Sequence, residues 1–174
     1  MGGCGVNPAL ALEVLSEGTK LLADTNWWVS AGTALGAYRD ALSDEFLARD
    51  TDLDVEVEGY IDLKPIFMDS GFKVHTEASV GPVKCQLALV KNGIIFDIYF
   101  YTRGVSDFVN FSEFGAVVVP SHLIDNAKIV NVRGIDLRFP SPPEEYLATR
   151  YGKDWAIPQP KKNWWEQAAN MVRP

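Results

Sequence analysis

The chain has 174 residues, of which 47% are hydrophobic and 22% charged, and its net charge at pH 7 is −7. This size and composition predict one folded domain over residues 1–174 and argue against intrinsic disorder. The acidic balance argues against broad binding to a DNA or RNA backbone. A small phosphorylated substrate remains compatible with it, because a bound divalent cation reverses the local field.

Two cysteines, Cys4 and Cys85, lie far apart in the sequence and do not form a disulfide framework, which favours a reducing compartment. The first residues lack a basic region followed by an apolar run, and no stretch of about 18 apolar residues occurs. We therefore expect a cytoplasmic protein without a membrane span. The oligomeric state is left open.

The first predicted element is a helix over residues 8–24. Asn7 followed by Pro8 has the pattern of an N-cap followed by a first-turn proline. Ala11 and Leu15 fall on one face of this helix, and we expect that face to be buried.

Short runs rich in β-branched and aromatic residues predict strands farther along the chain. In chain order these are residues 27–30, 53–58, 72–78, 83–90, 94–101, 116–119, 129–132 and 135–139. The Asn92-Gly93 pair predicts a hairpin between two of them, and Arg133-Gly134 predicts a second.

Further helices are predicted between and after these strands, over residues 34–42, 61–70, 142–151 and 164–172. Ser141 is expected to cap the third of these in a capping box with Glu144, and Gly152 to end it. Hairpins combined with packed helices indicate an α+β domain.

The segment Asp52-Leu53-Asp54 is the first candidate for chemistry. Side chains alternate between the faces of a strand, so Asp52 and Asp54 project to the same side while Leu53 and Val55 face the core. Two carboxylates at this spacing suit Mg²⁺, which binds through carboxylates together with substrate phosphates. The alternative is an exposed acidic strand edge.

Asp97 is the second candidate, because it interrupts the nearly continuous apolar run of residues 94–101. Such a run predicts a strand covered on both faces, where an unpaired carboxylate would cost several kcal/mol or take up a proton. A metal ion shared with Asp52 and Asp54 would supply the missing cation. The alternative is a salt bridge to a buried arginine such as Arg39.

If the three carboxylates converge, they repel one another in the absence of metal. The sequence therefore predicts that at least one of them has a raised pKa.

Gly32-Thr33 lies between a predicted strand and a predicted helix. Free backbone N–H groups at the start of a helix attract anions, and glycine allows a phosphate to approach closely. The pair alone is a weak signal, but it precedes an acidic strand by about twenty positions.

The order of these features resembles the LicD/fukutin family. The matching residues are the run from Gly32 to Arg39, then Phe46, then Asp52-Leu53-Asp54. The C-terminal stretches 143–147 and 151–155 are also similar to that family.

The resemblance implies a nucleotidyltransferase-like mixed sheet with flanking helices. It also implies that Asp52, Asp54 and Asp97 hold catalytic Mg²⁺ or Mn²⁺ ions, with Asp97 accepting the proton of the acceptor hydroxyl. Gly32, Thr33 and Arg39 would bind the substrate, although a structural ion pair remains open for Arg39.

The function implied is transfer of a nucleotidyl or substituted phosphoryl group. The donor would be an NTP or a CDP-linked alcohol, and the acceptor a hydroxyl group such as that of a glycan. The alternative is a non-catalytic module of the same fold that binds a nucleotide or a partner protein.

The remaining residues have ordinary structural interpretations. Trp27 and Trp28 are expected in the core, and His75 and His122 at the surface. The aromatic residues Trp155, Trp164 and Trp165 are expected to anchor the C-terminal segment, with base stacking as the alternative. Lys161 and Lys162 are expected to be solvated.

Overall fold

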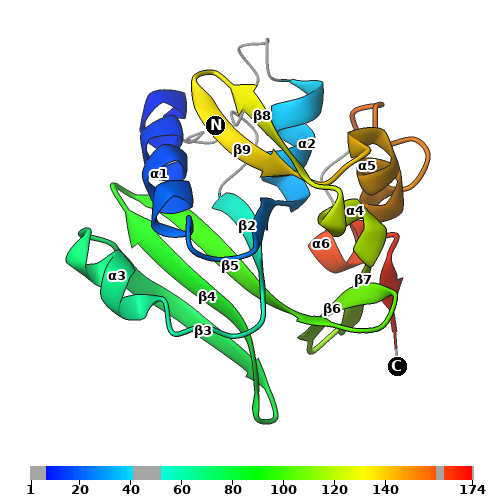
Figure 1. Cartoon of the computed structure of the whole chain (residues 1–174), viewed down its shortest axis with the longest axis horizontal. Coiled ribbons are helices and arrows are strands. Elements are labelled where there is room, and N and C mark those ends of the chain that lie inside the picture. Colours follow the sequence, from blue (N-terminus) through cyan, green and yellow to red (C-terminus); the bar gives the residue numbers. More distant parts are fainter. Residues whose placement is uncertain (1–6, 41–51, 160–162, 174) are drawn as a thin grey trace.

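A mixed β-sheet with helices packed on it forms the body of the protein (Figure 1). The computed structural model describes residues 7–40, 52–159 and 163–173. Its helices are α1 (Pro8–Leu21), α2 (Ala31–Arg39), α3 (Lys64–Asp69), α4 (Ser121–Asp125), α5 (Pro143–Tyr151) and α6 (Trp164–Gln167). Its strands are β1 (Trp27–Val29), β2 (Asp52–Glu58), β3 (Lys73–Val80), β4 (Val83–Lys91), β5 (Ile94–Arg103), β6 (Asp107–Ser112), β7 (Gly115–Pro120), β8 (Lys128–Val132), β9 (Ile135–Phe139) and β10 (Met171–Val172). The predicted α+β class is confirmed.

Strands β2 and β5 lie side by side in parallel, and the other strand pairs of the sheet are antiparallel. Strand β1 extends the sheet beyond β2, and β4 and β3 extend it beyond β5. The end of β5, at Thr102 and Arg103, also pairs with β6, which leads on to β7 and β10. Strands β8 and β9 form a separate hairpin.

Helix α1 is positioned by its cap and by one glycine. The Asn7 side chain accepts a hydrogen bond from Ala9 N at 3.0 Å, so the predicted N-cap is confirmed. Gly18 faces β5, where an added Cβ would lie 2.5 Å from the Phe96 ring. Only a residue without a side chain lets the helix approach the sheet this closely.

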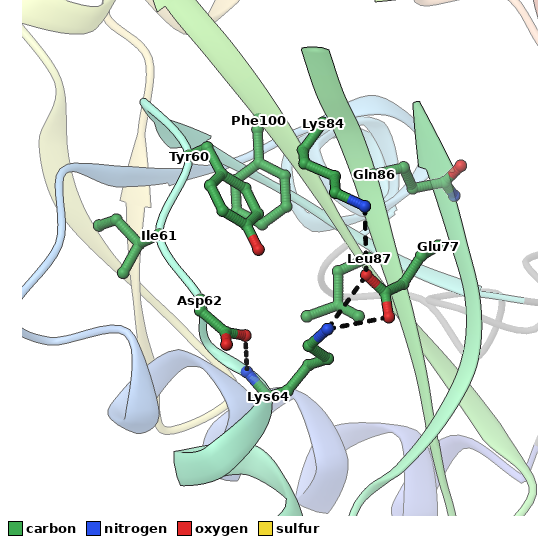
Figure 2. Close-up of a pocket in the computed structure, with 9 residues that line it drawn as sticks. All are labelled: Tyr60, Ile61, Asp62, Lys64, Glu77, Lys84, Gln86, Leu87 and Phe100. Carbon is green, nitrogen blue, oxygen red and sulfur yellow. Dashed lines mark hydrogen bonds and ion pairs between the residues drawn. The ribbon is translucent and has the colours of Figure 1, made fainter. Parts of the chain in front are cut away.

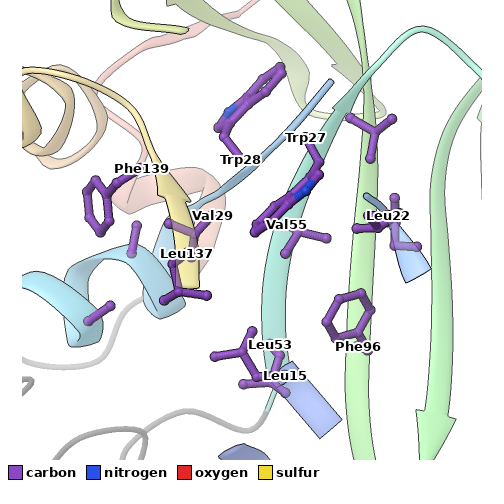
Figure 3. Close-up of a cluster of buried hydrophobic side chains, with 14 of the residues drawn as sticks. Leu15, Leu22, Trp27, Trp28, Val29, Leu53, Val55, Phe96, Leu137 and Phe139 are labelled. Carbon is purple, nitrogen blue, oxygen red and sulfur yellow. The ribbon is translucent and has the colours of Figure 1, made fainter. Parts of the chain in front are cut away.

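One part of the hydrophobic core lies between α1 and the sheet (Figure 3). Leu15 from α1 and Leu53, Val55 and Phe96 from the sheet are each no more than 1% exposed. The prediction that Leu53 and Val55 face the core is therefore confirmed. As expected, Trp27 and Trp28 are also buried.

Both predicted hairpins are confirmed by their backbone angles. Asn92 and Gly93 have φ values of +52° and +78°, and Arg133 and Gly134 have values of +51° and +85°. Two consecutive residues with positive φ form the turn whose twist matches the strands on either side.

Several helix boundaries differ from the prediction: α1 ends at Leu21 rather than at residue 24, and α3 covers Lys64–Asp69 rather than 61–70. Helix α2 begins at Ala31, so Gly32 and Thr33 belong to its first turn and do not precede it. Its predicted end at Leu42 lies outside the described residues, as do Phe46, Lys161 and Lys162. Helix α5 starts at Pro143 with Pro142 as its N-cap and no side-chain cap, so the predicted capping box of Ser141 and Glu144 does not form. The Ser141 backbone N–H bonds to Leu123 O.

Strand β6 and helix α4 were not predicted, and the last helix was predicted too long. Helix α6 covers only Trp164–Gln167, and the chain then forms β10 against β7. This pairing depends on Gly115, because a Cβ there would lie 2.3 Å from the Val172 carbonyl oxygen. The tertiary pairing therefore overrides the local helical pattern.

Within the residues that the structure describes, no helix combines the length and the apolar character needed to cross a bilayer.

Candidate metal-binding cleft

Asp52, Asp54 and Asp97 come together at one place on the sheet. Asp54 and Asp97 are register partners on the parallel strands β2 and β5, and Asp52 lies two residues before Asp54 on the same side of β2. One carboxylate oxygen from each residue lies within 4.8 Å of the other two. We call these three residues the acid cluster.

Helix α2 holds Asp54 in place from both its backbone and its side chain. The Thr33 hydroxyl accepts a hydrogen bond from Asp54 N at 2.8 Å, and Gly32 N donates to Asp54 Oδ2 at 3.2 Å. Ser30 N donates to the Asp54 carbonyl oxygen at 3.1 Å. The start of α2 thus contacts both the backbone and the carboxylate of Asp54.

This geometry bears on the predicted binding of a phosphate by Gly32 and Thr33. The Thr33 side chain is fully buried and the Gly32 N–H group contacts Asp54, while Gly32 also lines the cleft described below. Both residues thus contact the acid cluster. Their contact with a substrate stays a prediction.

Asp97 is 5% exposed, and Gln86 Nε2 donates a hydrogen bond of 2.9 Å to its Oδ1. Burial raises the pKa of Asp97 to about 6, Gln86 opposes this shift, and the negative charge of Asp52 adds to it. The predicted raised pKa is confirmed. Its main cause is desolvation, with repulsion between carboxylates as a smaller contribution.

The suggested salt bridge from Arg39 to Asp97 does not form. Arg39 instead binds Asp40, with Nη2 at 2.8 Å and Nε at 3.0 Å from its carboxylate oxygens. Its Nη1 donates to Trp155 O at 3.5 Å. Arg39 nevertheless lines the same cleft as Asp52 and Asp54.

The acid cluster fits a divalent cation. Its donors are three carboxylates, the hard oxygen ligands that Mg²⁺ and Mn²⁺ prefer. The hydrogen bond to Asp97 comes from a neutral amide, which does not neutralise a buried negative charge. Asp52, Asp54 and Asp97 are therefore the residues that would hold a metal ion.

A cleft of about 1150 Å³ opens beside the acid cluster. Asp52, Asp54 and Gly32 line it, together with side chains from the C-terminal part of the chain. This size exceeds that of most small-molecule pockets. Its lining includes many residues from position 150 onward, and we call five of them the C-terminal wall: Arg150, Tyr151, Trp155, Trp164 and Trp165.

The two consecutive tryptophans of this wall differ in their packing. The Trp165 ring stacks on Phe114 with centroids 4.3 Å apart and an angle of 13°. Trp164 meets Phe114 edge-on and is 43% exposed. The predicted anchoring role fits Trp165, whereas Trp164 has a free surface towards the cleft.

Two cleft residues were missed in the sequence. Glu56 follows Asp54 on the same side of β2, is 2% exposed and accepts a hydrogen bond from Trp28 Nε1. Burial raises the pKa of Glu56, and the charge of Arg150 opposes this. Apolar and acidic residues alternate along residues 53–58, and this pattern places Glu56 on the same side of the strand as Asp54. No local sequence pattern distinguishes Arg150.

A second pocket, between α3 and the exposed face of the β3–β4 hairpin, is much smaller (Figure 2). Its volume is about 10 Å³, which is enough for about one water molecule. Glu77 lies within ion-pair distance of both Lys64 and Lys84 there, at 3.0 and 4.0 Å. These groups satisfy one another, so the pocket is not a ligand site.

No protein-family model matches the chain. It is similar to the ribitol-5-phosphate transferase FKTN of Mus musculus, with 27% identity over 94% of this chain and 37% of the mouse protein. The human protein of the same name is 26% identical over 85% of this chain and 33% of its own length. These matches confirm the predicted resemblance to fukutin. The chain spans about a third of the length of the curated relatives.

Proposed function

We propose that this chain is a metal-dependent transferase that moves a substituted phosphoryl or nucleotidyl group from a nucleotide donor to a hydroxyl acceptor. The observation that carries the proposal is the convergence of Asp52, Asp54 and Asp97 within 4.8 Å beside a large cleft. Similarity to ribitol-5-phosphate transferases supports the same class of reaction.

The acid cluster has two tasks in this reaction, metal binding and proton transfer. Asp52, Asp54 and Asp97 would hold one or two divalent cations, which would supply positive charge to the donor phosphates and lower the pKa of the acceptor hydroxyl. Asp97 accepts the proton of that hydroxyl. The first turn of α2 positions Asp54, because Gly32 N donates to its carboxylate and Thr33 Oγ1 accepts from its backbone N–H.

The donor follows from the resemblance and from the names of the relatives. A CDP-linked alcohol is the first donor to test, with ribitol 5-phosphate as the transferred group and a glycan hydroxyl as the acceptor. NTP donors are the second choice. The cleft of about 1150 Å³ accommodates a nucleotide and a sugar together.

The test is a thermal-shift screen of CDP-alcohols and NTPs, each with EDTA and with Mg²⁺ or Mn²⁺. A ligand at a hundred times its dissociation constant stabilises the folded state by about 2.7 kcal/mol. We expect stabilisation that requires both metal and donor, followed by release of CMP or pyrophosphate when an acceptor is added. Metal-dependent binding without turnover of any donor would identify a binding module instead.

A further inference from the structure

Arg150 occupies a specific place in the cleft, in the last turn of α5. Its backbone is fixed, because Ala169 N donates to Arg150 O at 2.9 Å and ties α5 to the segment before β10. Its side chain is partly buried and lines the cleft together with Asp52 and Asp54.

The guanidinium of Arg150 makes few contacts for its donor capacity. Within the described residues its one side-chain hydrogen bond is from Nη1 to Asn170 Oδ1, and it is long, at 3.4 Å. Arginine offers five N–H donors, and no carboxylate of the described residues lies within 4.0 Å of the Arg150 side chain. Most donors of this cation are therefore available to a ligand.

Arg39 provides the contrast within the same cleft. Its Nε and Nη2 both bind the Asp40 carboxylate at about hydrogen-bond distance, 3.0 and 2.8 Å. The two arginines line one cleft, but only Arg150 lacks such a carboxylate partner among the described residues.

The position of Arg150 relative to the acid cluster can be read along the sheet. Glu56 and Tyr99 are register partners, one strand repeat beyond the partners Asp54 and Asp97. Glu56, Tyr99 and Arg150 all line the same cleft as Asp52 and Asp54. A strand repeat is about 6.6 Å, so Glu56 and Tyr99 lie about that far along the sheet from Asp54 and Asp97, in the part of the cleft that Arg150 also lines.

We propose that Arg150 binds one phosphate of the donor's diphosphate while the other phosphate lies at the acid cluster. This assignment rests on the proposed function, because it takes a nucleotide diphosphate ester as the donor. A planar guanidinium with unused N–H groups matches phosphate oxygens in a bidentate geometry. Arg150 would thus recognise the diphosphate rather than the nucleoside or the alcohol.

Calorimetry with CDP and with cytidine tests this proposal, both in Mg²⁺. We expect Arg150→Met to weaken CDP binding by about ten- to a hundredfold, the range for a hydrogen-bonded charge. Cytidine, which lacks the diphosphate, should bind both proteins equally. Arg150→Lys keeps the positive charge but lacks the planar guanidinium that can bind two oxygens at once. Its CDP affinity should therefore lie between those of wild type and Arg150→Met. Arg103→Met, which removes an arginine that pairs with Glu58 and Asp125 away from the cleft, should bind CDP as wild type does.

One further variant distinguishes this proposal from a purely structural role, in which Arg150 only offsets the negative charge of the buried Glu56. Glu56→Gln in the Arg150→Met background removes the stranded carboxylate and should restore the melting temperature. If it also restores CDP affinity, the proposal is wrong. Restored stability with weak CDP binding supports it.

Failure of this proposal can be told apart from failure of the proposed function. Equal CDP affinity of wild type and Arg150→Met overturns the role of Arg150, and so does the absence of CDP binding by wild type. Both conclusions hold whether or not the protein binds Mg²⁺. If CDP binding depends on Arg150 but not on Mg²⁺, the phosphate site stands and the metal-dependent transferase does not.

Discussion

Asp52 and Asp54 of the acid cluster border the same cleft as the C-terminal wall, but the two regions are built in different ways. The acid cluster comes from two neighbouring strands, β2 and β5, whose register places Asp54 beside Asp97. The C-terminal wall comes from α5, α6 and the segments around them, which reach the cleft through packing on β7 and β10. The acid cluster depends on strand periodicity, whereas the C-terminal wall depends on tertiary contacts alone.

Different interactions hold the residues of the two regions in place. Asp54 is held by hydrogen bonds to its backbone and its carboxylate from one turn of α2. Trp165 is held by a ring stack on Phe114, a residue of the β6–β7 turn. We expect changes in the acid cluster to affect chemistry more than folding, and changes in the anchor of the C-terminal wall to do the reverse.

Asp54→Asn should have the largest effect on chemistry. The amide keeps the shape and still accepts the hydrogen bond from Gly32 N, but it removes a negative metal ligand. Transfer activity and the Mn²⁺-dependent rise in melting temperature should both disappear, while the protein in EDTA melts at or above the wild-type temperature. Melting curves in EDTA and in excess Mn²⁺ measure both effects. A variant that melts far below wild type in EDTA would show that Asp54 belongs to a structural ion pair.

The pH dependence of Asp97 should be the next largest effect. Its pKa is about 6 in the folded protein and 3.8 ordinarily. Between these values the folded state binds more protons than the unfolded state, so raising the pH should lower the free energy of unfolding in EDTA. The loss over this window is on the order of 3 kcal/mol.

Urea unfolding at several pH values between about 4 and 7 measures this slope. Asp97→Asn should flatten it, and Mn²⁺ should reverse it because the cation favours the ionised carboxylate. The same slope in wild type and Asp97→Asn would assign the pH dependence to another group.

Trp165→Ala and Trp164→Ala form a matched pair in the C-terminal wall. The first removes a stacked ring and should lower the free energy of unfolding by about 2 kcal/mol, less than a fully buried aromatic would cost. The second removes a 43% exposed ring and should lower it by less than about 1 kcal/mol. Urea denaturation compares them. Equal losses would mean that both rings anchor the segment.

Thr33→Val should lower the free energy of unfolding only moderately but should have a distinctive effect on metal binding. It leaves Asp54 N without the Thr33 hydroxyl acceptor, which costs about 1–2 kcal/mol, and it loosens the hold on Asp54. Thr19→Val is the control, because Thr19 is also buried and its hydroxyl donates to Leu15 O away from the cleft. We expect only Thr33→Val to weaken Mn²⁺ binding, as measured by calorimetry.

Much of the fold follows from local patterns in the sequence. The Asn7 cap and the Asn92-Gly93 turn are local chemistry, and each forms as predicted. The acid cluster was predictable because a spacing of two places Asp52 and Asp54 on one side of a strand. Asp97 stood out because it is an acid within an apolar run.

The remainder depends on contacts that no local pattern records. Strand β6 contains Asn110, a polar residue that interrupts the apolar run but is buried and donates to Phe100 O and Cys85 O. Strand β10 exists because β7 offers an edge to it. Arg150 lies on a short helix with ordinary composition, and only the packing of α5 turns it towards the cleft.

The parallel register of β2 and β5 has a further consequence for the kinetics of folding. Helix α3 and the β3–β4 hairpin separate these strands in the chain, so Asp54 and Asp97 meet only when a long-range pairing forms. Contacts of this kind form slowly, and we expect them to be absent from the folding transition state. Mn²⁺ should then slow unfolding in stopped-flow experiments and leave the refolding rate unchanged. Bound metal would thus slow the unfolding of a domain that has already folded, without changing how fast it folds.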